Sequence, residues 1–170
     1  MTSNPTTMSA IDIAMSVASG ALTATQSVDA ALARIDALNP ELNGFTAITR
    51  DRAKRRAAEI DARRARGEKL GSLAGVVLAV KNLYDVAGVQ TLAGSKINRE
   101  HAPAKADATL VQRLEAQDAI LVGALNMGEY AYDFTDENAH YGPSRNPHDP
   151  LHMSGGSSGG SATAAAAGMA

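Results

Sequence analysis

A glycine- and serine-rich segment near the end of the chain is the first place where the sequence could support chemistry. Residues Gly155 to Ser161 read Gly-Gly-Ser-Ser-Gly-Gly-Ser and lead into an alanine-rich run that predicts a helix. Glycines permit positive φ and close backbone approach, and a helix start offers unpaired N–H groups. Such a turn could present a serine hydroxyl in a defined geometry or hold an anion. A nucleotide P-loop is excluded because no Lys-Ser/Thr pair follows the last glycine, whereas a flexible linker remains an alternative.

Lys81 is the second candidate, because it directly follows the apolar run Leu73 to Val80. A lysine in this position usually emerges into solvent. If it is instead partly desolvated, its pKa falls and the neutral amine can act as a general base. A serine hydroxyl is a weak nucleophile that needs such a base, and lysine–serine pairs are a known catalytic arrangement. The sequence therefore allows either an exposed cation or the base of a lysine–serine pair.

Histidines in the polar stretch that follows Asn126 could in principle bind a metal. The candidates are His140, His148 and His152, with Asp149 beside them. Pro147 and Pro150 prevent the last two histidines from sharing a helix face, so the spacing of a helical zinc site is absent. We expect no metal site, and expect these histidines to make local hydrogen bonds or to contact substrate.

The elements that would position these residues follow from periodicity and turn signals. We expect a helix over 9–20 and a second helix capped by Thr25 or Ser27 that stops at Asn39-Pro40. Further helices are expected over 50–66 and 108–117, and strands over 45–49, 73–80 and 119–125, the last two buried on both faces of a sheet. The proline-containing stretch after Asn126 should lack regular structure. The strand–helix–strand order predicts an α/β fold with a partly parallel sheet.

Composition limits the class of protein. The chain has 170 residues, 45% of them hydrophobic, with a formal net charge of −2 and no cysteine. One compact domain with a core is expected, without disulfides, and neither nucleic acid nor a membrane is expected as a direct partner. The basic cluster in 54–66 could form a nucleic-acid patch, but a solvated helix face offset by Asp51, Glu59 and Asp61 is the favoured interpretation. No secretory signal is visible, so we expect a cytoplasmic protein.

Several ordered motifs resemble those of the amidase-signature family. The Gly155 to Ala162 segment resembles its central glycine–serine signature, and Leu73 to Asn82 resembles its lysine block. Further similarity lies in 39–45, 91–95, 125–131 and 142–147, so the resemblance covers nearly the whole chain. Within the family, 81–86 and 137–142 are most similar to carboxybiuret-hydrolase-like members. The family often has proline where this chain has Val77, and aspartate where it has Asn82.

The resemblance implies an amidase-signature fold, a mixed β-sheet core covered by helices, of which this chain would be the N-terminal part. We expect residues 1–70 to form a helical region and residues 71–170 the lysine block and serine loop. The implied activity is hydrolysis of a C–N bond in a small amide or urea-like compound, without cofactor or metal. Alternatives are the A subunit of a glutamine-dependent tRNA amidotransferase, or a non-catalytic fragment that binds an anion or a partner. The resemblance also implies a homo- or hetero-oligomer, with a small accessory subunit as one form of partner.

The resemblance also assigns roles to particular residues. Lys81 would be the base, and Ser157, after a cis peptide bond, would relay a proton from the nucleophile to it. The other predicted site residues would hold the loop by hydrogen bonds or contact substrate: Ser154, Gly155, Gly156, Ser158 and Tyr130. The family's nucleophilic serine and oxyanion hole belong to a glycine-containing motif downstream of Ser157 that these 170 residues do not include. We therefore expect these residues alone to be inactive.

Overall fold

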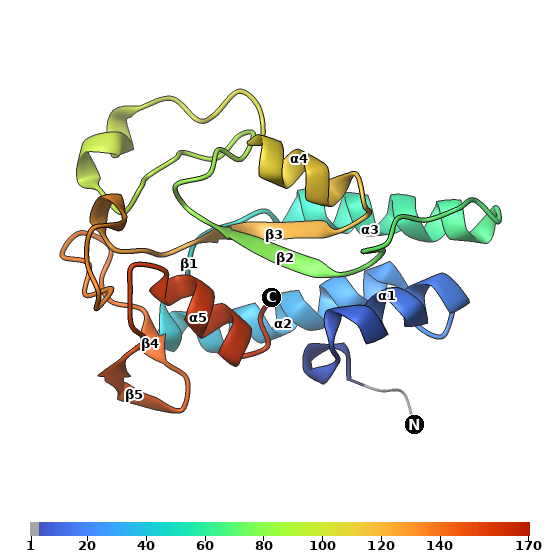
Figure 1. Cartoon of the computed structure of the whole chain (residues 1–170), viewed down its shortest axis with the longest axis horizontal. Coiled ribbons are helices and arrows are strands. Elements are labelled where there is room, and N and C mark those ends of the chain that lie inside the picture. The colour runs from blue at the N-terminus through green and yellow to red at the C-terminus, as the bar shows by residue number, and fades with distance from the viewer. Residues whose placement is uncertain (1–3) are drawn as a thin grey trace.

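A computed structural model describes residues 4–170 and contains a mixed three-stranded sheet (Figure 1). Its strands are β1 (Phe45–Ile48), β2 (Val77–Lys81) and β3 (Ile120–Leu125), in the order β1-β3-β2. β1 runs antiparallel to β3, whereas β2 runs parallel to it. The predicted α/β fold with a partly parallel sheet is confirmed. Because β2 and β3 are parallel, their carboxyl ends lie at the same end of the sheet, where the long loops gather (Figure 1).

The two apolar runs that predicted buried strands differ in how much of each is buried. All six residues of β3 are buried, since this strand has a neighbour on each edge and helices over its faces. The expectation for 73–80 is wrong in part: Leu73–Val76 forms a turn and the strand begins at Val77. Only Val80 of β2 is buried, because β2 has one hydrogen-bonded neighbour and lies at the edge of the sheet.

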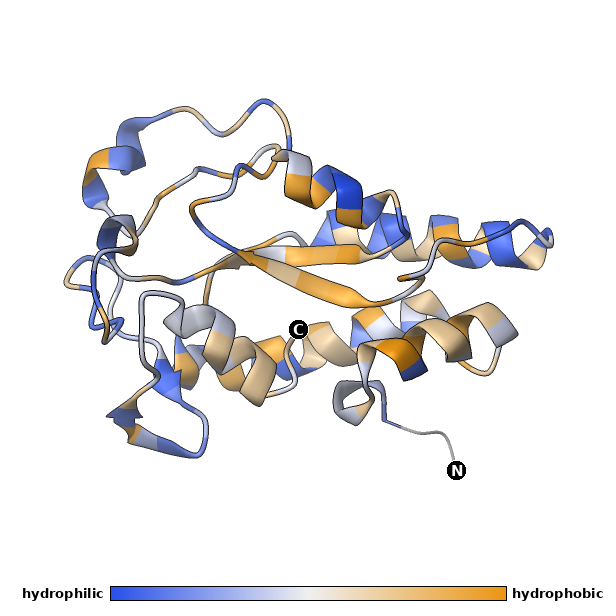
Figure 2. Cartoon of the chain, viewed as in Figure 1, coloured by the Kyte–Doolittle hydropathy of each residue, from blue (hydrophilic) through white to orange (hydrophobic). Residues whose placement is uncertain are grey.

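Helices cover both faces of the sheet (Figure 1). Their bounds are α1 (Ala10–Ser19), α2 (Ala24–Leu42), α3 (Arg50–Ala65), α4 (Thr109–Glu115) and α5 (Gly159–Ala166). α2 and α5 lie on the face opposite α4, and α3 packs on both α2 and β3. Successive β3 side chains therefore enter different clusters: Ile120 and Val122 join the larger one with α1, α2 and α3, and Leu121 joins Val80 and Val111 beneath α4. Figure 2 shows β2 and β3 largely in orange between the helices, and blue residues alternate with orange ones along α3 and α4.

Helix α2 departs from prediction at both ends. Its N-cap is Thr23, whose hydroxyl accepts from the backbone N–H of Gln26 while the Gln26 side chain accepts from the N–H of Thr23. This reciprocal capping box displaces Thr25 and Ser27 from the capping role. The helix also continues past Pro40 to Leu42, because proline removes one N–H donor but its φ suits a helix. Asn43, at φ 52°, ends it.

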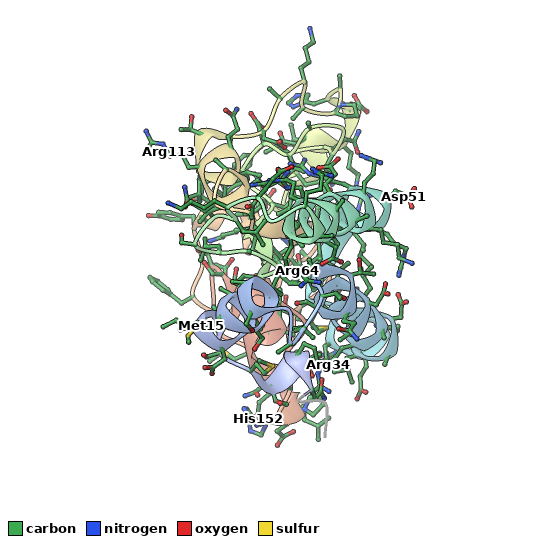
Figure 3. The ribbon with its side chains drawn as sticks, turned by 90° about the vertical axis from the view of Figure 1, so that its right-hand side faces the viewer. Met15, Arg34, Asp51, Arg64, Arg113 and His152 are labelled. Atoms are coloured by element: carbon green, nitrogen blue, oxygen red, sulfur yellow. The ribbon has the colours of Figure 1, made fainter. Side chains whose placement is uncertain are left out.

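The basic residues of α3 are only partly a solvated face. Asp51 of α3 and Arg113 of α4 project from the outer surface (Figure 3). Two arginines instead converge on one carboxylate: Arg56 and Arg63 donate to Asp118 at 2.8 and 2.6 Å, and the Asp118 side chain is 2% exposed. Arg52 likewise pairs with Asp107 and Glu115. These arginines thus join α3 to α4 and its flanking turns.

The polar stretch after Asn126 contains more regular structure than predicted. It holds a two-stranded hairpin of β4 (Arg145–Asn146) and β5 (Asp149–Met153), with Pro150 inside β5. Proline is tolerated there because a strand of an isolated hairpin has a free edge that needs no N–H donor. Short 3-10 helices complete the described chain: η1 (Pro5–Thr7), η2 (Lys96–Glu100) and η3 (Glu129–Ala131).

Two kinds of feature are absent from residues 4–170. No helix in this range combines the length and the apolar character needed to cross a membrane. No group of three or more histidine, aspartate and glutamate side chains in this range is placed to hold a metal ion.

Candidate active site

Lys81 and the paired serines meet at the carboxyl end of the parallel strands. Lys81 is the last residue of β2, and its Nζ donates to Ser157 Oγ at 2.8 Å and to Ser158 Oγ at 3.0 Å. Lys81 and Ser157 are 76 residues apart in sequence. The structure therefore brings these two residues into direct hydrogen bonding, and places Ser158 on the same amine.

Two opposing effects act on the pKa of Lys81, and the net result is a lowered pKa. Burial lowers the pKa of Lys81 below its ordinary value, while the carboxylates of Asp136 and Asp133 act in the opposite direction. Burial has the larger effect because a desolvated ammonium loses hydration that two hydroxyls replace incompletely. A larger fraction of neutral amine is thus present at a given pH, which is the form that accepts a proton.

Backbone hydrogen bonds hold the serine turn to the loop that follows β3 and to the first turn of α5. The Gly156–Ser157 peptide bond is cis. Gly156 N–H donates to the Phe134 carbonyl at 2.8 Å, and Gly128 N–H donates to the Ser157 carbonyl at 3.1 Å. The Ser158 carbonyl accepts from Ala162 N–H within the first turn of α5. The turn therefore has partners on both sides of the serine pair, unlike a flexible linker.

The glycines of the turn are needed for two different reasons, a positive φ at one position and close packing at two others. Gly155 has a φ of 79° and open space around its α-carbon, so it supplies a left-handed backbone. Gly156 and Gly159 supply close approach instead. A Cβ at Gly156 would lie 2.6 Å from the backbone nitrogen of Asp136, and one at Gly159 would lie 2.1 Å from Asp136 Oδ2. These contacts explain the need for glycine on either side of the serines.

Two buried asparagines connect the strand ends to the surrounding loops, and sequence reasoning did not find their roles. Asn82 follows β2 and is 1% exposed; its amide donates to Thr46 Oγ1 at 2.7 Å and its Oδ1 accepts from Leu92 N–H. Asn126 follows β3 and is fully buried; its amide donates to the Gly142 carbonyl at 2.9 Å. The signal that could have found them is a polar residue directly after each apolar strand.

Two aspartates beside the serine turn were also missed. Asp133 Oδ1 accepts the backbone N–H of Thr135 at 2.9 Å and of Asp136 at 2.6 Å, which folds 133–136 into a tight turn. Asp136 is fully buried at φ 62°. The Asp-x-x-Asp spacing predicts an Asx-type turn but gives no indication that the second carboxylate is buried.

Ser154 and Tyr130, which were also predicted site residues, make their hydrogen bonds elsewhere and not to Lys81 Nζ. Ser154 Oγ donates only to the adjacent Gly155 carbonyl, at 3.3 Å. Tyr130 is 54% exposed and its hydroxyl donates to Asn98 Oδ1, not to either serine. His152 pairs with Asp149 on the exposed hairpin, and His140 pairs with Glu129. The contacts of the two histidines are local, as expected.

The geometry allows one kind of chemistry in particular. A partly desolvated amine hydrogen-bonded to a serine hydroxyl can accept a proton from it, and the serine can accept one in turn from a third group. Such a chain of hydroxyl and amine moves protons from one side chain to the next. The site is therefore suited to activating a nucleophile that approaches Ser157.

Comparisons with known proteins show what this chain is similar to. The Amidase family model matches residues 26–170. AtzE of Pseudomonas sp. (strain ADP), which forms part of 1-carboxybiuret hydrolase, is 56% identical over 162 residues, covering 95% of this chain and 35% of that protein. The A subunit of a Glutamyl-tRNA(Gln) amidotransferase from Streptomyces avermitilis is 45% identical, covering 94% and 32%. The chain thus spans about a third of the length of these curated relatives.

Solved structures show the same fold. A chain from a vestigial protein complex, described in relation to the origins of an s-triazine catabolic enzyme, has a TM-score of 0.94 at 56% identity and covers 95% of this chain and 35% of its own. A bacterial aryl acylamidase of the amidase-signature family has a TM-score of 0.89 at 30% identity and covers 95% and 34%. Because the Amidase family model matches residues 26–170, which is most of this chain, the chain belongs to the amidase-signature family.

Proposed function

We propose that the intact protein hydrolyses a C–N bond in a small amide or urea-like compound, and that this chain supplies its base and proton relay. The observation that carries the proposal is the hydrogen bond of 2.8 Å between Lys81 Nζ and Ser157 Oγ, made by an amine whose pKa is lowered by burial. An exposed lysine would be protonated at neutral pH and could not accept a proton.

The proposed proton transfers pass through Ser157. As the nucleophile attacks the amide carbonyl, its proton passes to Ser157 Oγ and the Ser157 proton passes to Lys81 Nζ, giving an ammonium. The ammonium then returns the proton, through Ser157, to the leaving nitrogen. Water hydrolyses the resulting acyl-enzyme. The family resemblance implies that the nucleophile and oxyanion donors follow Ser157 in the sequence, outside residues 1–170.

Ser158 has a supporting role in this scheme. Its hydroxyl accepts the second hydrogen bond of Lys81, at 3.0 Å. Two acceptors restrict the rotation of the amine and aim its lone pair or third proton. We infer that Ser158 orients the base, while Gly155 and Gly156 let the turn reach it. Ser154 and Tyr130 remain candidates for loop support and substrate contact at the edge of the site.

The substrate class is proposed from similarity. A carboxybiuret- or allophanate-type compound is favoured because the carboxybiuret hydrolase relative is 56% identical, against 45% for the amidotransferase relative. The second candidate, a glutaminase subunit of a tRNA amidotransferase, is favoured by the latter similarity. Ammonia release from biuret-type compounds and from glutamine, measured with the intact protein, distinguishes the two. We also infer a partner chain, since both relatives are named as subunits.

Exchange of Lys81 tests the proposal most directly. In the intact protein, Lys81→Met and Ser157→Ala are each expected to lower kcat/KM for the preferred amide by about a hundredfold to ten-thousandfold, the range of general acid–base catalysis. Lys105→Met removes an exposed lysine and serves as the matched control. Circular dichroism establishes that each variant is folded. Turnover by folded Lys81→Met close to that of Lys105→Met would contradict the proposed role.

A further inference from the structure

Asp136 is a buried carboxylate that neither the motifs nor the proton relay uses. Its side chain belongs to the turn formed by 133–136 and is fully buried. Oδ2 accepts a long hydrogen bond of 3.3 Å from Ser144 N–H. Oδ1 is buried and has no hydrogen-bond partner among the described residues. A buried carboxylate with so few donors is expensive to desolvate, so its position calls for a compensating role.

Asp136 packs against two glycines of the serine turn, one before and one after the serine pair. Its backbone nitrogen lies against Gly156 and its Oδ2 lies against Gly159, so close that no Cβ fits at either glycine. Gly156 and Gly159 bracket the Ser157–Ser158 pair. The N–H of Gly156 is also bonded to the carbonyl of Phe134, within the same turn. Residues 133–136 therefore pack against the glycines on either side of Ser157 and Ser158, the two serines that accept hydrogen bonds from Lys81.

The charged groups around Asp136 and Lys81 are few and can be named. Burial raises the pKa of Asp136, and Asp133 acts in the same direction, while Ser144 and Lys81 lower it. The carboxylates that act on Lys81 are Asp136 and Asp133. Asp133 Oδ1 is already engaged by two backbone N–H groups, whereas Asp136 Oδ1 has no such bond among the described residues. Asp136 and Lys81 are thus mutual counter-charges across the serine turn.

We propose that Asp136 is a positioning residue for the base: it supports the serine turn through Gly156 and Gly159 and stabilises the ammonium that Lys81 becomes when it accepts a proton. The effect of Asp136 on turnover rests on the proposed function. The electrostatic coupling between Asp136 and Lys81 does not. Burial lowers the pKa of Lys81, which weakens its hold on a relayed proton. A buried negative charge behind the serines restores part of that basicity without occupying the hydrogen bonds that the serines need.

Asp136→Asn is the decisive variant, because asparagine keeps the shape and tolerates φ 62° while removing the charge. Glu137→Gln is the matched control, since it removes a charge from the next residue, whose side chain is exposed. The pKa of Lys81 is read in the intact protein from the ¹³Cε resonance of labelled lysine, assigned by its loss in Lys81→Met. We expect Asp136→Asn to lower that pKa by about one unit and Glu137→Gln to leave it nearly unchanged.

Activity provides a second readout. The limb of the pH profile on which kcat/KM rises with pH should move to lower pH by a similar amount in Asp136→Asn, and kcat at the optimum should fall about tenfold. A purely structural role would lower activity without moving this limb. An unchanged Lys81 pKa, or the same displacement in Glu137→Gln, would overturn the proposal.

If Asp136→Asn does not fold, the coupling is tested from the other side, by exchanging Lys81. Coupling is reciprocal, so Lys81→Met should raise the pKa of the Asp136 carboxyl, followed by ¹³Cγ titration of labelled aspartate. No change there would also overturn the proposal. These titrations need no turnover: failure of the proposed function appears as activity in Lys81→Met, and failure of the present inference appears as uncoupled titrations.

Discussion

Gly159 is the residue at which the serine turn and the buried carboxylate come closest. It is the first residue of α5, and its φ is not positive, so an alanine there would have no backbone strain. The space for a methyl group is nevertheless taken by the Asp136 side chain. The absence of a side chain at this position is therefore needed for packing and not for conformation.

Gly159→Ala is expected to destabilise the protein by about 2 kcal/mol, the cost of forcing an extra carbon into a filled site. The cost should shrink in an Asp136→Gly background, because glycine at φ 62° is unstrained and vacates the space. Urea unfolding of both single variants and the double variant gives the coupling energy. Strictly additive effects would show that the clash is not with Asp136.

At the scale of elements, α2 illustrates how a helix start is chosen among competing candidates. Thr23, Thr25 and Ser27 all have hydroxyls able to cap, but only Thr23 has a glutamine three residues later that completes a capping box. Thr25 Oγ1 donates instead to Asp61 Oδ2 of α3, at 2.7 Å. The N-cap at Thr23 thus depends on Gln26, and Thr25 links α2 to α3 through its hydrogen bond to Asp61.

Thr23→Ala is therefore expected to lower the free energy of unfolding by about 1 kcal/mol, as for other N-cap losses. Ser27→Ala is the control, since its hydroxyl makes no capping contact within α2. Thermal unfolding followed by circular dichroism compares the two. A loss for Ser27→Ala as large as that for Thr23→Ala would show that the capping box does not set the start of the helix.

At the scale of the whole molecule, Asp118 joins parts of the chain that are distant in sequence. Its carboxylate accepts from Arg56 and Arg63 of α3 and, at 2.6 Å, from the backbone N–H of Gly71 before β2. The residue itself lies in the turn between α4 and β3 at φ 64°. One buried charge therefore holds α3, the approach to β2 and the start of β3 together.

Asp118→Asn should cost about 3 kcal/mol, because two arginines then face a neutral amide in a buried setting. The backbone is preserved, since asparagine accepts a left-handed φ. Asp36→Asn breaks the exposed pair between Arg50 and Asp36 and should change stability by less than about 1 kcal/mol. Denaturant unfolding of both variants measures the contrast. A small loss for Asp118→Asn would mean that the arginines find other partners.

The elements whose signals are local and repeated could be predicted from the sequence. The α1 and α3 helices, β1, and the continuous apolar β3 follow from periodicity, and the order of the motifs was sufficient to indicate the family. The end of an apolar strand made Lys81 a candidate base and the glycine-rich turn offered candidate hydroxyls, but only the family resemblance named Ser157 as the partner of Lys81. The hydrogen bond between them forms only in the folded chain, because the two residues are 76 positions apart in the sequence.

Which apolar run is central and which carboxylate is buried depend on tertiary structure and could not be read from the sequence. The runs that become β2 and β3 are similar in composition, and only neighbours across the sheet make β3 central and β2 an edge. Asp136 follows another aspartate in a polar stretch for which the sequence predicts no regular structure. Its burial arises because the glycines around Ser157 leave space that this turn fills, and such complementarity between distant segments has no periodic signature in a single sequence.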